Sequence, residues 1–389
     1  MPSQSARLEA LPVYVFVAIG ERIRQLEAQG IPVVRLDIGN PDMPPPSAVI
    51  EALADSAQQA KNHGYAGYRG TASFRQAVAR YYKRRFGVEV NPETQVLPLI
   101  GSKEGIVNLS LAYLDSGDTA LVPDISYPSY ALGAQLAGAS PVWVPLRTEN
   151  GYLIDVSAIR PDDARKAKLM WVNYPNNPTG ATADLPFYQQ VLDFCAANDI
   201  LLVSDNPYVE VTFDHYTAPS VLQVPGALEH SIEFVSFSKS HNMAGWRLGA
   251  AVGSSKALST LLQVKSNVDS GHFKAIYDAA IVALDTPQSW IDQRNLVYQR
   301  RRDRLMKVLP EIGLEAQCPK GSLYIWAKVL DMSVDDYIEQ ALMKAHVTFA
   351  PGTAYGPGGD GYLRISLGVD DQELDVAIQN LKSWYAKRS

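Results

Sequence analysis

The middle of the chain alternates short apolar runs with clusters of polar residues, glycine and proline. The runs are rich in residues that favour β-strands, and they cover residues 95–100, 119–123, 169–173, 200–203 and 232–235. Segments of helical length with amphipathic spacing lie between them, such as residues 185–198. Strands that alternate with helices predict a parallel or mixed sheet covered by helices on both faces. In such sheets ligands bind beyond the carboxyl ends of the strands, which is where the polar clusters fall.

The two ends of the chain differ in pattern from the middle. Residues 41–46 (PDMPPP) are typical of an ordered connector after an N-terminal arm. A long polar helix is predicted to begin within residues 285–299, and mixed strands and helices follow it. We therefore expect two domains. Residues 46–285 form the large one, and residues 1–45 together with 286–389 form a smaller one.

Composition and charge narrow the class of protein. The 389 residues are 47% hydrophobic and 20% charged, which suits a large core and excludes a disordered chain. With 41 acidic against 35 basic residues, the net charge of −6 gives no reason to expect nucleic-acid binding. Cys195 and Cys318 are too few for a disulfide framework, so we expect a cytoplasmic protein.

The length of the apolar segments argues against a membrane protein, and the spacing of the histidines argues against a metal site. The apolar segment 11–20 is too short to span a membrane, so we expect no membrane association. The six histidines lack the spacing of metal ligands, and we expect no metal site.

A lysine follows the last apolar run in the motif SFSKSHNMAGWRLG. Lys239 is flanked by Ser236, Ser238 and Ser240. Arg247 follows eight residues later, with a glycine between them. Two cations, three hydroxyls and a glycine that permits close approach indicate a phosphate pocket with a lysine at its edge. A lysine near other positive charge has a lowered pKa and is a competent nucleophile, for which Schiff-base chemistry is the natural use. Taken alone, the same lysine also fits a solvated surface position.

Two polar clusters at strand ends suit a heteroaromatic ring. Asp205, in SDNPY, could keep a pyridine nitrogen protonated, and Tyr208 could donate to a ring hydroxyl. A protonated ring is the electron sink that pyridoxal phosphate chemistry requires. The amide of Asn177, in NNPTG, could reach the same ring oxygen. The plain alternatives are a helix cap for Asp205 and an ordinary turn for NNPTG.

Three more segments are candidate ligand sites. Ser102 and Lys103, in GSKEG, open a predicted helix whose free amides form a phosphate site, or else an ordinary helix start. Tyr127, in DISYPSY, could stack on a planar cofactor or belong to the core. Residues 356–361 (GPGGDG) have the spacing of a dinucleotide-binding loop. Pro357 and the strand-like run that follows argue against that interpretation.

The order and spacing of these motifs resemble those of the class I and II pyridoxal-phosphate aminotransferases of fold type I. The resemblance rests on GSKEG, SYPSY, NNPTG, SDNPY, SFSKSHNMAGWRLG and YLRIS, and it covers essentially the whole chain. It implies an α/β fold whose large domain has a mixed, mostly parallel seven-stranded sheet between helices, beside a smaller α+β domain. It also implies transamination of an L-amino acid with a 2-oxo acid, with pyridoxal 5'-phosphate as cofactor and 2-oxoglutarate as acceptor.

The resemblance implies a role for each motif residue around the cofactor. Lys239 would bind the cofactor covalently and then shuttle a proton. Asp205 would pair with the pyridine nitrogen, and Tyr127 would stack on the ring. Tyr208 and Asn177 would hold the ring oxygen. The implied catalytic residues are Lys239, Asp205 and Tyr208. The implied phosphate ligands are Ser102, Lys103, Ser236 and Arg247.

The same resemblance places the substrate. Arg364, in YLRIS, would bind the α-carboxylate in a bidentate manner while the backbone at Gly39 closes over it. Tyr65, in GYAGYRG, resembles a tyrosine that reaches the phosphate site of the neighbouring subunit, which implies a homodimer with shared active sites. The alternative for Tyr65 is a surface tyrosine. The implied substrate-binding residues are Tyr14, Gly39, Tyr65, Lys103, Asn177 and Arg364.

Among the subfamilies, the sequence most resembles the LL-diaminopimelate aminotransferases of lysine biosynthesis. Tyr14, in the arm YVFVAI, and Lys103 carry this resemblance. No second arginine of the kind used by aspartate-specific enzymes is evident. His272 stands where an asparagine is expected at a distal contact, which leaves the distal specificity open. Aspartate, alanine and aromatic aminotransferases share every motif that carries the cofactor. A lyase or decarboxylase of the same fold and a ligand-sensing regulator also stay open as interpretations.

Overall fold

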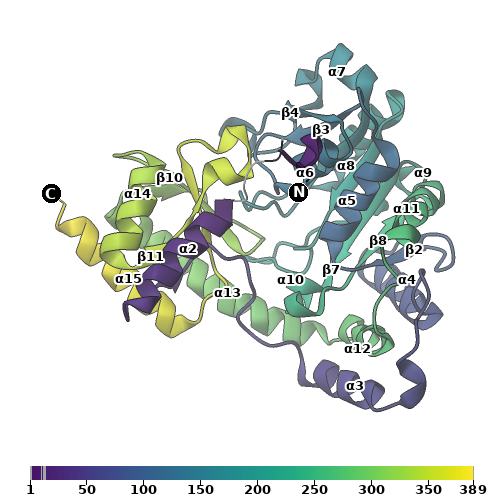
Figure 1. Cartoon of the computed structure of the whole chain (residues 1–389), viewed down its shortest axis with the longest axis horizontal. Helices are drawn as coiled ribbons and strands as arrows, with labels where there is room; N and C mark the ends of the chain where they lie inside the picture. The colour runs from purple at the N-terminus through teal and green to yellow at the C-terminus, as the bar shows by residue number, and fades with distance from the viewer. Residues whose placement is uncertain (1, 10, 12–14, 389) are drawn as a thin grey trace.

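A seven-stranded sheet lies at the centre of the computed structural model, which describes residues 2–9, 11 and 15–388 (Figure 1). The strands, in spatial order, are β2 (Val96–Leu99), β8 (Gly249–Gly253), β7 (Ser231–Ser236), β6 (Leu201–Asp205), β5 (Ala167–Val172), β3 (Thr119–Pro123) and β4 (Ser140–Val144). The strands from β7 to β4 run parallel, and β8 is antiparallel to both neighbours. The prediction of a mixed, mostly parallel sheet is confirmed.

Alternate side chains along each strand pack into two separate cores, one on each face of the sheet. On β5, Leu169 and Trp171 join one core, whereas Met170 and Val172 join the other. The first core is covered by α5 (Ser102–Tyr113), α6 (Ser129–Leu136) and α11 (Ser255–Val268). The second is covered by α3 (Ser47–Ala57), α4 (Ala72–Phe86), α8 (Leu185–Ala197) and α12 (Lys274–Leu284). Shorter helices include α1 (Ala6–Glu9), α7 (Pro161–Lys166), α9 (Ala227–His230) and α10 (Phe237–Ser240).

Two strands of the large sheet carry weak sequence signals and were not predicted. β8 reads GAAVG, which has little apolar mass. Its first residue, Gly249, has no room for a side chain, because a Cβ atom would lie 2.7 Å from the Val235 carbonyl oxygen and 3.2 Å from the Ser102 amide. β4 reads SPVWV and lies at the edge of the sheet, where a proline is tolerated.

A smaller antiparallel sheet stands beside the large one (Figure 1). Its strands, in spatial order, are β12 (Ala350–Pro351), β13 (Tyr362–Ser366), β10 (Tyr324–Val329) and β9 (Leu314–Ala316). Its surroundings include α2 (Val15–Ala28), α14 (Val334–Gln340), α15 (Asp371–Ala386) and the parallel pair β1 (Val34–Arg35) and β11 (Val347–Thr348). We propose that these parts form the smaller domain expected from residues 1–45 and 286–389.

The long helix α13 (Gln288–Val308) connects the two regions (Figure 1). The core around the small sheet also includes Tyr208 and Phe213, which follow β6 of the large sheet. Packing is therefore continuous between the two sheets, and side chains from both reach the carboxyl edge of the large one. Within the described residues, no helix combines the length and apolar character that a membrane crossing requires.

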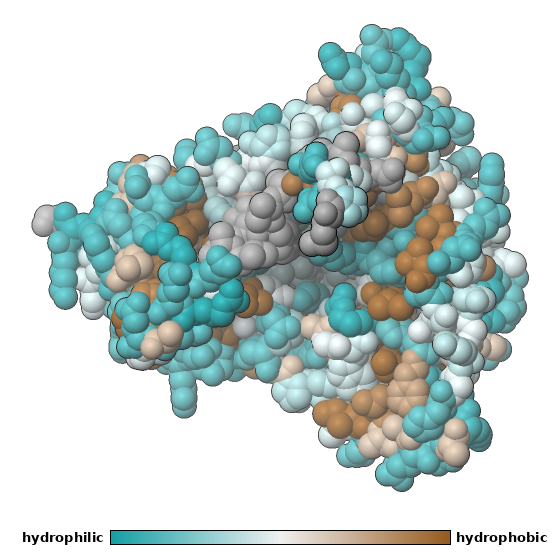
Figure 2. Space-filling view, viewed as in Figure 1, coloured by the Kyte–Doolittle hydropathy of each residue, from teal (hydrophilic) through white to brown (hydrophobic). Residues whose placement is uncertain are grey.

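Exposed apolar side chains gather on one face of the molecule, over α3, α5, α11 and the start of α12 (Figure 2). We call this the apolar face and define it by Ile50, Leu111, Val268 and Phe273, whose exposed fractions run from 37% to 60%. Exposed apolar side chains gathered on one face are typical of an interaction site.

Candidate active site

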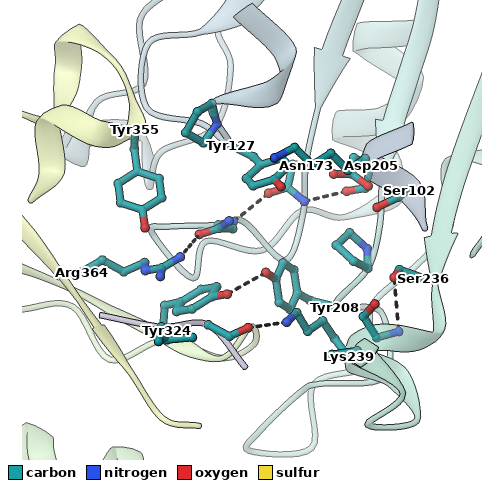
Figure 3. Close-up of a pocket in the computed structure, with 18 of the residues that line it drawn as sticks. Ser102, Tyr127, Asn173, Asp205, Tyr208, Ser236, Lys239, Tyr324, Tyr355 and Arg364 are labelled. Atoms are coloured by element: carbon teal, nitrogen blue, oxygen red, sulfur yellow. Dashed lines mark hydrogen bonds between the residues drawn. The ribbon is translucent and has the colours of Figure 1, made fainter. Parts of the chain in front are cut away.

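A cavity of about 460 Å³ opens at the carboxyl edge of the large sheet, where the small sheet packs against it (Figure 3). In the sheet, β4 lies on one side of β3 and β5 lies on the other. The cavity therefore lies where the strand order reverses, as is typical of ligand sites in such sheets. The structure brings together in its lining Gly39, Ser102, Lys103, Tyr127, Asn177, Asp205, Tyr208, Ser236, Lys239, Arg247 and Arg364. Strand ends that are far apart in the sequence therefore meet in one cavity.

Lys239 lies on α10, directly after β7, and its side chain points into the cavity. Its Nζ donates a hydrogen bond to the backbone carbonyl of Gly39. Burial lowers the pKa of the ammonium group. Tyr324 acts in the opposite direction, whereas the positive charges of Arg364 and Arg247 lower this pKa further. Its position in the cavity and its hydrogen bond to Gly39 exclude the alternative of a solvated surface lysine. A desolvated lysine with a depressed pKa has the properties of an amine nucleophile.

A buried arginine holds the backbone of the turn that carries this lysine. Arg294 of α13 donates to the carbonyl oxygens of Lys239 (3.0 Å), Ser240 and Glu210. Burial lowers the pKa of the guanidinium to about 10. No local pattern marks this role, because Arg294 is one of many charged residues on a polar helix.

Asp205 ends β6 and is buried, with 3% of its surface exposed. One carboxylate oxygen accepts a hydrogen bond of 2.7 Å from the hydroxyl of Tyr130, while Oδ1 has no hydrogen-bond partner in the described part of the chain. Burial raises the pKa of the carboxyl group to about 7. The amide of Asn173 donates to the Asp205 backbone carbonyl (2.6 Å), and its oxygen accepts from the backbone amide of Asn177 (2.7 Å). A buried carboxylate oxygen that lacks a donor fits a cationic ligand.

Arg364 of β13 is fixed on several sides. It donates to the side-chain oxygen of Asn177 (3.1 Å) and to the backbone carbonyl of Asp37 (2.6 Å). Its guanidinium lies 3.9 Å from the ring centroid of Tyr324 and 4.9 Å from that of Tyr355. Arg364 Nε has no hydrogen-bond partner among the described residues. An oriented guanidinium with a donor left over suits the bidentate binding of a carboxylate.

Arg35 also lines the cavity and was not predicted from the sequence. Its Nε and Nη2 donate to the two carboxylate oxygens of the fully buried Asp37, at 2.8 and 2.7 Å. The cavity thus contains a third arginine beside Arg247 and Arg364. Because Asp37 already engages two of its nitrogens, Arg35 contributes less free charge than an unpaired arginine would.

The start of α5 faces Arg247 across one corner of the cavity. Gly101, the N-cap residue, has φ of 72°, and a Cβ atom there would lie 2.4 Å from Arg247 Nη2. Arg247 itself has φ of 55°, a region that residues other than glycine rarely adopt. Ser102 at the first turn and Ser236 at the end of β7 complete this corner. Helix amides, a hydroxyl and a guanidinium in one corner form a suitable phosphate site.

Some predicted residues lie outside this cavity. Tyr65 is 90% exposed and is not part of the lining. His272 is half-buried, with Nε2 3.4 Å from the Leu99 carbonyl oxygen. Tyr14 falls outside the described residues, so the expectation for it stays a prediction. Within the described residues, no group of three or more His, Cys, Asp or Glu side chains is arranged to hold a metal ion.

The sequence matches the family model for aminotransferases of class I and II over residues 31–381. The chain belongs to this family. The aminotransferase is 47% identical over 381 residues to an LL-diaminopimelate aminotransferase from Dehalococcoides mccartyi, and the match covers 98% of each chain. It is similar to the apo structure of BacF from Bacillus subtilis, with a TM-score of 0.95, 34% identity and 99% coverage of each chain. It is also similar to a probable N-succinyldiaminopimelate aminotransferase from Thermus thermophilus, with a TM-score of 0.89, 35% identity, and coverage of 95% of this chain and 100% of that one.

The aminotransferase is therefore an enzyme that acts on amino acids and 2-oxo acids with pyridoxal phosphate as cofactor. The predictions of family, fold, enzyme class and cofactor are confirmed.

The pKa of Asp205 predicts how the stability of the cofactor-free aminotransferase depends on pH. Because the folded-state pKa is about 7 and the unfolded value is about 4, folding binds a proton between these values. This contribution to stability is present below about pH 4 and is lost as pH rises through about 7. It amounts to at most about 4 kcal/mol.

Asp205→Asn keeps an acceptor for Tyr130 and removes the titration. In urea denaturation of the apoproteins, the wild-type midpoint should fall more steeply with rising pH than that of the variant. Parallel pH profiles for the two proteins would contradict the assignment.

Proposed function

We propose that the enzyme transfers an amino group from LL-diaminopimelate to 2-oxoglutarate. The observation that supports this most directly is the similarity to the LL-diaminopimelate aminotransferase of Dehalococcoides mccartyi, 47% identical and matched along nearly the whole of both chains. A second relative of the same name, from Moorella thermoacetica, is 45% identical over 380 residues. The proposal extends the substrates of these relatives to this chain.

The cavity residues fit the cofactor. We propose that Asp205 pairs with the pyridine nitrogen, since its Oδ1 is buried without a partner among the described residues. Lys239 would hold the cofactor aldehyde through its Nζ, and the helix start at Ser102, with Ser236 and Arg247, would bind the phosphate. Bound there, the cofactor supplies an electron sink for the bond broken at the substrate α-carbon.

Four further residues would orient the ring and complete its contacts. Tyr127 lines the cavity and would stack on the ring. Tyr208 and Asn177 would face the ring oxygen. Lys103 lies one residue beyond Ser102 at the same helix start and would add a positive charge near the phosphate.

The substrate α-carboxylate would bind Arg364, with the backbone at Gly39 over it. Arg364 is already oriented by Asn177 and by the Asp37 carbonyl, so binding requires little ordering of this side chain. Once the carboxylate is held, Lys239 can take the α-proton on its Nζ, because its lowered pKa favours the neutral amine.

Selectivity must then come from the far end of the substrate. The distal part of diaminopimelate carries a second carboxylate and a second ammonium group. Lys103 and Arg35 line the cavity and would supply donors to the carboxylate. Tyr14 would add a hydroxyl. A polar pocket of this kind discriminates strongly, because a ligand without distal groups leaves its donors buried and unpaired.

We propose that two chains assemble through the apolar face (Figure 2). One ring contact joins this face to the loop that contains His63 and Tyr65, because the ring centroids of His63 and Phe273 lie 5.3 Å apart. Tyr65 extends from the same loop with 90% of its surface exposed, which suits a side chain that reaches a neighbouring subunit. In such a homodimer Tyr65 would complete the phosphate site of the partner.

Covalent binding is tested at Lys239. Reduction of the holoenzyme with borohydride should abolish its visible absorbance and leave the reduced adduct on the peptide that contains Lys239. Lys239→Arg keeps a long basic side chain and should lower kcat by about a thousandfold or more, because the nucleophile and proton carrier is lost. The adduct on another lysine, such as Lys103, would overturn the assignment.

Substrate choice is tested with a panel of amino donors and 2-oxoglutarate. LL-diaminopimelate should give a kcat/KM at least about a hundredfold above those of alanine, aspartate and phenylalanine. Lys103→Gln should lower this preference over alanine about tenfold. Lys168→Gln, at the exposed second position of β5, is the matched control and should leave the preference unchanged. A lower kcat/KM for LL-diaminopimelate than for the other three donors would exclude this substrate.

Assembly is tested with two valine substitutions of similar exposure. Val268→Asp introduces a charge on the apolar face and should convert the dimer to monomers in sedimentation velocity, with at least about tenfold weaker cofactor binding. Val376→Asp, on α15 and 48% exposed, is the control and should remain dimeric. A fully active monomer at working concentration would contradict the shared active site.

A further inference from the structure

Tyr324 lies where the two sheets meet, and no motif in the sequence marks it. It belongs to β10, is 2% exposed and lines the cavity. Its hydroxyl oxygen is 3.0 Å from that of Tyr208, and the two rings are in edge contact at a centroid distance of 5.7 Å. Figure 3 shows the two hydroxyls pointing toward each other across the cavity floor. The small sheet thus supplies a hydrogen-bond partner for a tyrosine that follows a strand of the large sheet.

The ring of Tyr324 also supports Arg364. In the small sheet Tyr324 pairs with Ser366 and Trp326 pairs with Arg364, so Tyr324 and Arg364 are diagonal neighbours on adjacent strands. Diagonal neighbours on one face lie within reach of long side chains. The guanidinium carbon lies 3.9 Å from the ring centroid, which is a close cation–π contact. The ring therefore fixes one face of the guanidinium.

The hydroxyl of Tyr324 is also packed against Gly39. A Cβ atom on Gly39 would lie 1.9 Å from the Tyr324 hydroxyl oxygen, so no side chain fits between them. The carbonyl of Gly39 accepts the hydrogen bond from Lys239. Tyr324 thus borders the segment that holds Lys239, as well as contacting Tyr208 and Arg364.

We propose that Tyr324 is a positioning residue for transamination: its hydroxyl holds that of Tyr208, and its ring holds the guanidinium of Arg364. The proposal rests on the proposed function, in which Tyr208 faces the ring oxygen of the cofactor and Arg364 binds the substrate carboxylate. One side chain of the small sheet then sets the geometry at both groups.

The hydroxyl contact has an electrostatic consequence. Burial and the neighbouring Tyr324 raise the pKa of Tyr208 far above its usual value, so Tyr208 keeps its proton and can donate it. When that proton faces the cofactor oxygen, the oxygen of Tyr208 accepts from Tyr324, and consecutive hydrogen bonds strengthen each other. With Tyr208 as a stronger donor, negative charge on the cofactor oxygen is better stabilised. The oxygen then attracts a proton on the nitrogen of Lys239 less strongly.

Tyr324→Phe removes the hydroxyl and keeps the ring. In the holoenzyme, the pH midpoint of the visible absorbance change should rise by about half a pH unit or more, because the nitrogen of Lys239 holds its proton more tightly. The dissociation constant of glutarate, an unreactive dicarboxylate probe, should change by less than about twofold, because the ring still supports Arg364. Tyr324→Leu removes both contacts and should weaken glutarate binding about tenfold as well.

Tyr337→Phe is the matched control. Tyr337 is buried in the same core, and its hydroxyl donates to the Ile312 carbonyl at 2.9 Å, so the variant also loses one buried tyrosine hydroxyl. Its absorbance midpoint should equal that of the wild type. An unchanged midpoint in Tyr324→Phe, or an equal shift in Tyr337→Phe, would overturn the proposal.

Two further variants test the route through Tyr208. In a Tyr208→Phe background, Tyr324→Phe should cause no additional shift, since the partner hydroxyl is absent. Gly39→Ala retains Tyr324 in the sequence and should also raise the midpoint, because the added methyl group would displace the Tyr324 hydroxyl. A full additional shift in the double variant, or no shift in Gly39→Ala, contradicts the proposal. These absorbance readings need no amino donor, so they stay valid if LL-diaminopimelate proves not to be the substrate.

Discussion

The cost of burying cations governs the arrangement of this active site. Lys239, Arg247 and Arg364 converge at the carboxyl edge of the large sheet, where charge that is removed from water is expensive. Lys239 donates to the carbonyl of Gly39, and Arg364 donates to that of Asp37. Carbonyl oxygens replace water around a cation but do not cancel its charge. The cavity therefore keeps a positive potential that attracts anions, such as the phosphate and carboxylates of a transamination reaction.

The carbonyls of Asp37 and Gly39, which accept these hydrogen bonds, belong to a segment far in the sequence from both Lys239 and Arg364. The segment is held in turn by α13, where Arg301 donates to both carboxylate oxygens of Asp42 at 2.9 Å. Arg294, on the same helix, holds the turn that carries Lys239. A single helix between the two regions thus fixes the lysine and the segment that receives its hydrogen bond. The site forms only when both ends of the chain have packed against the large sheet.

The sequence was sufficient for the parts of the site that follow directly from a strand. Asp205 ends its strand, and Ser102 and Lys239 lie within a few residues of theirs, so an apolar run followed by a polar cluster locates them. Tyr324 and Arg294 could not be found in this way. Their partners lie 116 and 55 residues away along the chain, and no local pattern marks such contacts. The glycine-rich β8 was missed for a related reason, since the packing of neighbouring backbones determines it.

Oδ1 of Asp205, which lacks a hydrogen-bond partner in the part of the chain that the structure describes, makes the cofactor important for folding before any reaction takes place. A ligand that satisfies this oxygen stabilises the folded chain and has no comparable effect on the unfolded one. Newly synthesised chains therefore depend on the supply of the cofactor, and chains that do not receive it are exposed longer to proteases. Binding of the cofactor therefore affects the lifetime of the folded chain as well as the reaction.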